Sequence, residues 1–150
     1  ETAIRMMNSA MVIRGEDDLF STVDISALNL YDGNCTFYKI GASATFIRRA
    51  DCVECLISEN LPVGVYHSVE IEKTTRSLSD GDFIIMMSDG VLEYLNVPHP
   101  EEAMESIIAG IDTNHPGRFA KQLLDQVLVY TDGKVSDDMT VLVAAVWEKA

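Results

Sequence analysis

A run of five apolar residues at positions 83–87 (FIIMM) constrains this chain more than any other stretch. The run has no polar alternation, so it predicts a strand that is buried on both faces. An Asp-Gly turn signal at 80–81 leads into the strand, and Ser-Asp-Gly follows it at 88–90. A carboxylate at the tip of a buried strand, next to a glycine that permits a sharp turn, lies where ligands and metals are commonly bound. The alternative interpretation is that Asp89 only caps a helix that begins near Val91.

Composition and charge indicate a globular domain and argue against some classes of binding partner. The chain has 150 residues and is 47% hydrophobic, which is enough to bury the core of one soluble globular domain. No stretch approaches the 18 or so uninterrupted apolar residues of a membrane span. The chain carries 24 acidic and 11 basic residues, a net charge of −13. This charge argues against nucleic acid or an anionic lipid surface as a partner, since both require clustered Lys and Arg.

The three cysteines, Cys35, Cys52 and Cys55, favour a reducing compartment over a disulfide scaffold because their number is odd. Cys52 and Cys55 have the spacing of a zinc knuckle. No second cysteine or histidine pair completes four ligands, so buried free thiols are the simpler interpretation.

Hydrophobic periodicity and turn signals predict a succession of antiparallel strands, interrupted by helices near both ends. The opening helix covers residues 1–14, with Gly15 as its C-cap. The predicted strands are residues 19–31, 35–40, 45–49, 52–57, an edge strand in 68–78, the central run 83–87, and a last doubly buried strand that ends at 146. Further helices are predicted from about 91, over 101–111 and over 118–130. This order favours a meander of antiparallel strands over regularly alternating strands and helices.

Two acidic turns lie at the ends of the two strands that are predicted to be most buried. Asp89 follows one strand, and the pair Asp137 and Asp138 precedes the other. If these strands lie side by side, the carboxylates converge, and carboxylates without Lys or Arg nearby need a cation. Hard oxygen ligands with no His or Cys beside them suit Mg²⁺ or Mn²⁺ rather than zinc. The alternative for Asp137 and Asp138 is an ordinary polar turn.

These residues carry a resemblance to a known family. Ser-Asp-Gly-Val at 88–91 and Ser-Asp-Asp-Met-Thr-Val at 136–141 are similar, in type and order, to the last two motifs of the metal-dependent PPM-type (type 2C) serine/threonine protein phosphatases. Within that family the chain resembles the bacterial sporulation and stress-response branch. Supporting matches cover nearly the whole chain, at residues 19–33, 38–43, 61–64 and 81–82.

The resemblance implies an α/β (α+β) fold, a layered sandwich of two antiparallel sheets flanked by helices. It also implies a site for Mn²⁺ or Mg²⁺, two ions in the complete domain, at which water attacks phosphoserine directly and no protein nucleophile is required. Asp89 carries over as a metal ligand, and Ser88 and Gly90 form its supporting turn. Alignment on the family's Asp-Asn-x-Thr pattern makes Asp137 a ligand. Because a second Asp replaces Asn here, Asp138 is an equal candidate.

The chain departs from the family at its beginning. The family's first motif, an Asp-Gly whose Asp bridges both metals, has no equivalent before Glu1, and Asp32-Gly33 falls in a hairpin turn. We therefore expect residues 1–150 to form one N-terminally truncated PPM-type domain of a longer chain. Alone, this piece is expected to bind metal weakly or not at all and to have little activity, and tight stoichiometric Mn²⁺ binding in calorimetry would contradict that.

The resemblance also implies a partner and a location. The substrate would be a phosphorylated anti-sigma-factor antagonist, whose dephosphorylation activates a sporulation sigma factor. The domain would lie in the cytoplasm, as part of a membrane-anchored bacterial protein, without direct membrane contact, and a homodimer is left open. The runner-up is a non-catalytic regulatory or interaction module on the same fold. A receiver-like phosphoacceptor domain also has an Asp at a strand tip, but this chain lacks a Lys at a later strand end and the alternating topology.

Overall fold

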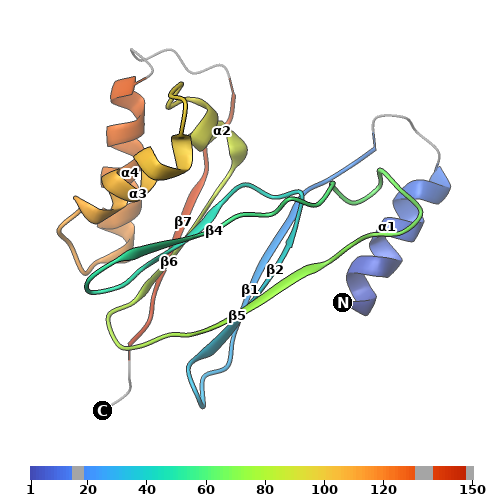
Figure 1. The fold of residues 1–150 in the computed structure, drawn as a ribbon, viewed down its shortest axis with the longest axis horizontal. Helices are drawn as coiled ribbons and strands as arrows, with labels where there is room; N and C mark the ends of the chain where they lie inside the picture. The colour runs from blue at the N-terminus through green and yellow to red at the C-terminus, as the bar shows by residue number, and fades with distance from the viewer. Residues whose placement is uncertain (15–18, 131–136, 148–150) are drawn as a thin grey trace. The chain divides into compact units, whose positions relative to one another are not determined.

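The computed structural model describes residues 1–14, 19–130 and 137–147 (Figure 1). The chain divides into two compact units. The first unit is made of Glu1–Ala42 and Ile57–Ser77, and the second of Ser43–Leu56 and Leu78–Ala150. Both acidic turns that the sequence singles out belong to the second unit.

The first unit combines helix α1 (Thr2–Arg14) with a three-stranded antiparallel sheet. The strands are β1 (Val23–Leu28), β2 (Asn34–Ile40) and β5 (Glu72–Ser77), in the order β1-β2-β5. In the central strand, buried Cys35 and Phe37 alternate with half-buried Thr36, as the two-residue period of a strand requires. The predicted edge position of the strand in 68–78 is confirmed, because β5 lies at the end of the strand order β1-β2-β5 in the described residues.

The turn between β1 and β2 confirms the predicted hairpin but shortens the predicted strand. Gly33 has φ of 71°, which is readily accessible to glycine, and its N–H donates to the carbonyl of Asn29. The strand predicted over 19–31 is therefore too long, because Asn29 already belongs to the turn. At its other end, Ser21 forms only an isolated bridge with Val63. Gly15, predicted as the C-cap of α1, lies outside the described residues.

The described residues of the second unit form a four-stranded antiparallel sheet and three helices. The strands are β3 (Thr45–Arg48), β4 (Val53–Leu56), β6 (Phe83–Met87) and β7 (Val141–Ala145), in the order β4-β3-β6-β7. The helices are α2 (Asp89–Glu93), α3 (Pro100–Ala109) and α4 (Pro116–Tyr130), close to the predicted ranges. None of the helices in the described residues is long and apolar enough to cross a membrane.

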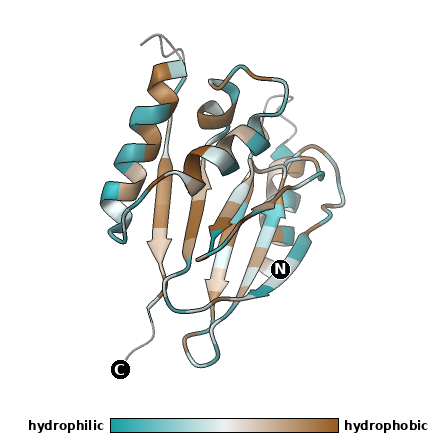
Figure 2. Ribbon diagram, turned by 60° about the vertical axis from the view of Figure 1, so that its left-hand side comes forward, coloured by the Kyte–Doolittle hydropathy of each residue, from teal (hydrophilic) through white to brown (hydrophobic). Residues whose placement is uncertain are grey.

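The core of the second unit lies between its sheet and the apolar sides of α3 and α4. Figure 2 shows hydrophobic strands beside a helix whose outer side is hydrophilic. Phe119 of α4 stacks on Phe83 of β6 with ring centroids 5.4 Å apart, and the guanidinium of Arg48 lies over both rings. Each fully buried large side chain of this kind stabilises the fold by about 1.5–3 kcal/mol. The core therefore fixes β6 firmly in the sheet.

The two strands that lead to the acidic turns differ in burial. In β6 four of five residues are buried and Met86 is half-buried, so the predicted strand with two covered faces is confirmed. The same prediction for the last strand is wrong. β7 has an alternating pattern, because Val141, Val143 and Ala145 pack against the core of the second unit while Leu142, 54% exposed, lies on the opposite face of the strand.

Candidate metal centre

The first acidic turn lies where β6 passes into α2. Ser88 occupies the N-cap position of α2, and Asp89 is the first helical residue. The interpretation of Asp89 as the cap is therefore wrong. Its carboxylate is exposed, and Oδ1 accepts a hydrogen bond from the N–H of Gly90 at 2.9 Å. The buried strand thus presents Asp89 to solvent from a fixed position.

The second acidic turn lies beside the first because β6 and β7 are paired. Met87 stands opposite Val141 in the antiparallel register, and the N–H of Ser88 donates to the carbonyl of Thr140 at 3.0 Å. The hydroxyl of Ser88 also donates to the carbonyl of Asp138 at 3.3 Å. The predicted convergence of the two acidic turns is confirmed by these contacts.

Gly90 makes this convergence possible by its small size. A Cβ atom placed on Gly90 would lie 2.9 Å from the carbonyl oxygen of Asp138 and 3.8 Å from Cβ of Asp137. Gly90 is not among the described glycines with positive φ, so a sharp turn does not explain its presence. The role predicted for Gly90 is corrected: the glycine allows close approach of the second acidic segment, and the turn itself does not require it.

The chemistry of the donor set suits a hard divalent cation. Asp89, Asp137 and Asp138 are all exposed, and within the described residues none of them forms an ion pair with Lys, Arg or His. Oδ1 of Asp137 accepts the N–H of Asp138 at 2.7 Å, much as Asp89 accepts that of Gly90. Adjacent carboxylates without a basic partner favour binding of Mg²⁺ or Mn²⁺. Among the described residues, no three His, Cys, Asp or Glu side chains are grouped so that they could hold a metal, so Asp89, Asp137 and Asp138 do not form a complete site in this arrangement.

Another acid of the central stretch has a structural role. Asp82, at the start of β6, is only 4% exposed, and its Oδ2 accepts hydrogen bonds from Arg49 Nη1 and the N–H of Ser79, each at 2.9 Å. A buried carboxylate with a guanidinium partner needs no metal. The two acids that flank β6 therefore differ in burial: Asp82, just before the strand, is buried and structural, whereas Asp89, two residues after its end, is exposed.

The Asp-Gly pair at 32–33 belongs to the hairpin of the first unit, as predicted. Oδ1 of Asp32 accepts the N–H of Asn34 at 2.9 Å, and this hydrogen bond lowers the pKa of Asp32. The carboxylate is therefore engaged in shaping its own turn.

The cysteines fit free thiols better than a metal site. Cys35 is fully buried, and its burial raises the pKa of the thiol, so it stays protonated near neutral pH. Cys52 is exposed and Cys55 is half-buried, so the prediction of buried thiols holds fully only for Cys35.

The chain is similar to known proteins over nearly its whole length. Residues 1–147 match the family model of stage II sporulation protein E (SpoIIE). The chain belongs to this family. The resemblance carried by the motifs at 88–91 and 136–141, to PPM-type phosphatases and in particular to the phosphatase domain of stage II sporulation protein E, is confirmed.

One relative within the family is stage II sporulation protein E of Bacillus subtilis. The chain is 36% identical to it over 145 residues, which is 96% of the chain and 18% of that protein's length. The chain also matches the solved structure of the PP2C phosphatase domain with a fragment of the regulatory domain of that protein, with 36% identity and a TM-score of 0.88. This match covers 96% of the chain and 43% of the solved chain, and it confirms the predicted fold class, mixed α/β with two antiparallel sheets.

A more distant likeness extends the fold beyond the family. The catalytic domain of the serine/threonine protein phosphatase PstP, solved in complex with two manganese ions, has 18% identity and a TM-score of 0.70. The match covers 98% of the chain and 70% of the PstP chain. At this level of identity the likeness establishes the shared fold alone.

Proposed function

We propose that this chain is the phosphatase domain of a metal-dependent serine/threonine protein phosphatase that hydrolyses phosphoserine. The observation that carries the proposal is the position of Asp89 against the Asp137-Asp138 segment, without a basic partner among the described residues, in a chain of the stage II sporulation protein E family. The two manganese ions bound by PstP, which shares the fold, support Mn²⁺ or Mg²⁺ as the cofactor.

The residues of the chain have defined roles in this proposal. Asp89 and Asp137 would hold the cation through carboxylate oxygens, with Asp138 as the alternative ligand, while Ser88 supports the turn and Gly90 leaves room for the second acidic segment beside it. A bound pair of such cations supplies charge neutralisation at the phosphoryl group and a lowered pKa for the attacking water. The chain's own contribution is to hold the two acidic turns side by side through the contacts of Ser88 and Gly90 with Asp138, so that fewer conformations are lost when a cation binds.

The substrate and setting follow from the family resemblance. We infer that the phosphoserine belongs to an anti-sigma-factor antagonist and that its dephosphorylation activates a sporulation sigma factor. Membership of a sporulation protein family supports this choice. We further infer a cytoplasmic domain of a membrane-anchored bacterial protein. The net charge of −13 is consistent with a protein partner and unfavourable for nucleic acid.

Release of phosphate from a phosphoserine-containing anti-sigma-factor antagonist tests the proposed function. The complete protein is expected to release phosphate when Mn²⁺ is added, and excess EDTA is expected to stop the reaction because the carboxylates cannot act without the cation. A phosphothreonine version of the same protein is the comparison for side-chain preference. Binding of the antagonist without any Mn²⁺-dependent release of phosphate would instead support the regulatory module.

The two candidate ligands of the second motif are distinguished by comparing Asp137→Asn with Asp138→Asn. What favours Asp137 is that its Cβ lies 3.8 Å from the Cβ position of Gly90, whereas Asp138 approaches Gly90 and Ser88 through its backbone carbonyl. We expect Asp137→Asn to lower kcat/KM by about 100-fold or more, and Asp138→Asn by less than about tenfold. The reverse order in Mn²⁺-dependent turnover would assign the ligand to Asp138.

A further inference from the structure

Ser88 stands where a strand becomes a helix, and its two backbone groups serve different elements. Its N–H donates to the carbonyl of Thr140 at 3.0 Å, which continues the β6–β7 ladder one residue beyond Met87 and Val141. Its carbonyl accepts the N–H of Val91 at 3.1 Å in the first turn of α2. In a regular antiparallel pair, that carbonyl would accept the N–H of Thr140. Because the carbonyl of Ser88 is used by the first turn of α2, the N–H of Thr140 needs another acceptor.

The hydroxyl of Ser88 replaces the missing acceptor. The N–H of Thr140 donates to Oγ of Ser88 at 2.9 Å, and the same hydroxyl donates to the carbonyl of Asp138 at 3.3 Å. The side chain of Ser88 thus forms hydrogen bonds with backbone groups of the residues before and after Met139. Only a hydroxyl combines the donor and the acceptor for these two contacts at this length, so Ser or Thr is required.

We propose that Ser88 is a positioning residue for the metal site: its hydroxyl holds the Asp137-Asp138 segment against Asp89 without itself binding the cation. The inference rests on the proposed function. The held segment passes so near to α2 that the carbonyl oxygen of Asp138 lies 2.9 Å from the Cβ position of Gly90. Without the hydroxyl, only the hydrogen bond from Ser88 N–H to the carbonyl of Thr140 joins Ser88 to this segment. The distance between the two acidic turns would then vary more.

The test compares Ser88→Ala with the wild type and with Ser88→Thr, which keeps the hydroxyl. Amide exchange of Thr140 measures the hydrogen bond directly, without metal. Paramagnetic broadening of the amide signals of Gly90 and Asp138 during Mn²⁺ titration measures cation binding, even when binding is weak. In Ser88→Ala we expect Thr140 to exchange about tenfold faster and the half-broadening Mn²⁺ concentration to rise about tenfold. Ser88→Thr is expected to restore both values to within about twofold of the wild type.

Ser106→Ala is the matched control, because it removes a serine hydroxyl from the same unit. Within the described residues that hydroxyl donates to the carbonyl of Glu102, at 3.0 Å on α3, and the substitution should change neither measurement. Unchanged exchange of Thr140 in Ser88→Ala would overturn the hydrogen-bond role. Faster exchange with an unchanged Mn²⁺ response would overturn the positioning role. If the wild type shows no broadening at Gly90 or Asp138, the proposed function fails, while exchange of Thr140 still decides whether the hydroxyl holds the segment.

Discussion

Asp89→Asn is expected to abolish Mn²⁺-dependent dephosphorylation while the fold stays intact. Asparagine has nearly the shape of aspartate, and its amide oxygen can still accept the N–H of Gly90, but it has no charge to hold a divalent cation. Turnover should fall by about 10²–10³-fold or more, as when a charge-stabilising group is removed from a reaction centre. Because Asp89 is exposed, the free energy of unfolding should change by less than about 0.5 kcal/mol.

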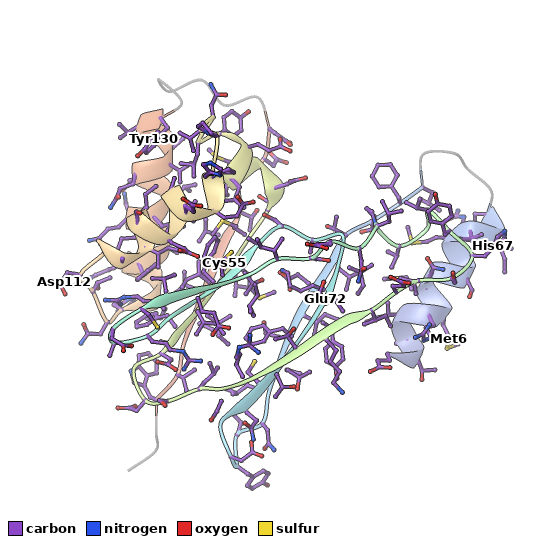
Figure 3. The ribbon with its side chains drawn as sticks, viewed as in Figure 1. Met6, Cys55, His67, Glu72, Asp112 and Tyr130 are labelled. Atoms are coloured by element: carbon purple, nitrogen blue, oxygen red, sulfur yellow. The ribbon has the colours of Figure 1, made fainter. Side chains whose placement is uncertain are left out.

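The measurement is kcat/KM for phosphoserine substrate at several Mn²⁺ concentrations, together with thermal unfolding of the metal-free protein. Asp112→Asn is the matched control: Asp112 is also exposed and belongs to the same unit. It lies just before α4, at the end of the unit away from Tyr130 and α2 (Figure 3). This variant should keep full activity. Turnover by Asp89→Asn that matches the wild type at every Mn²⁺ concentration would remove Asp89 from the site.

The parts of the fold and the site that sequence predicts well are those that a single local signal determines. Five apolar residues without alternation indicated β6, and the observed burial of Phe83 and Ile85 follows from the packing of α3 and α4 on this part of the sheet. Asp-Gly at 32–33 indicated the hairpin because glycine readily adopts its φ of 71°. The adjacency of the two acidic turns could be predicted as well, since it required only that two apolar strands be neighbours.

The remaining features depend on contacts between distant segments, which no local pattern records. The exposure of Leu142 reflects its place on the face of β7 opposite the core, whereas the sequence of β7, as apolar as that of β6, predicted burial. The hydroxyl of Ser88 acquires its role only because the carbonyl of Ser88 already accepts the N–H of Val91. The N–H of Thr140, opposite Ser88 on the neighbouring segment, therefore donates to the hydroxyl instead. The apolar-to-polar change at Ser88 marks the strand end, and it does not reveal which backbone groups the side chain bonds.

Gly90→Ala is expected to impair the site strongly although alanine removes no ligand. The added Cβ would lie 2.9 Å from the carbonyl oxygen of Asp138, and since this neighbour is backbone, the acidic segment itself must move. Displacement of a reacting group by about 1 Å can lower the rate by roughly 100-fold, and we expect a loss of that order in kcat/KM. Alanine favours a helix over glycine by about 0.5–1 kcal/mol, which offsets part of the roughly 1–3 kcal/mol that overpacking costs. The loss of activity should therefore greatly exceed the loss of stability.

Gly110→Ala separates this steric effect from the general effect of adding a methyl group. Gly110 ends α3 with φ of −79°, and a Cβ there would meet its nearest atom, the carbonyl oxygen of Ile107, at 3.5 Å, an ordinary contact. Its activity should match the wild type. Because Gly90→Ala displaces the acidic segment but keeps every carboxylate, higher Mn²⁺ should recover part of its activity, whereas Asp89→Asn should recover none. Wild-type activity in Gly90→Ala would mean that the segment can move aside freely, and the adjacency of the two acidic turns would then not govern catalysis.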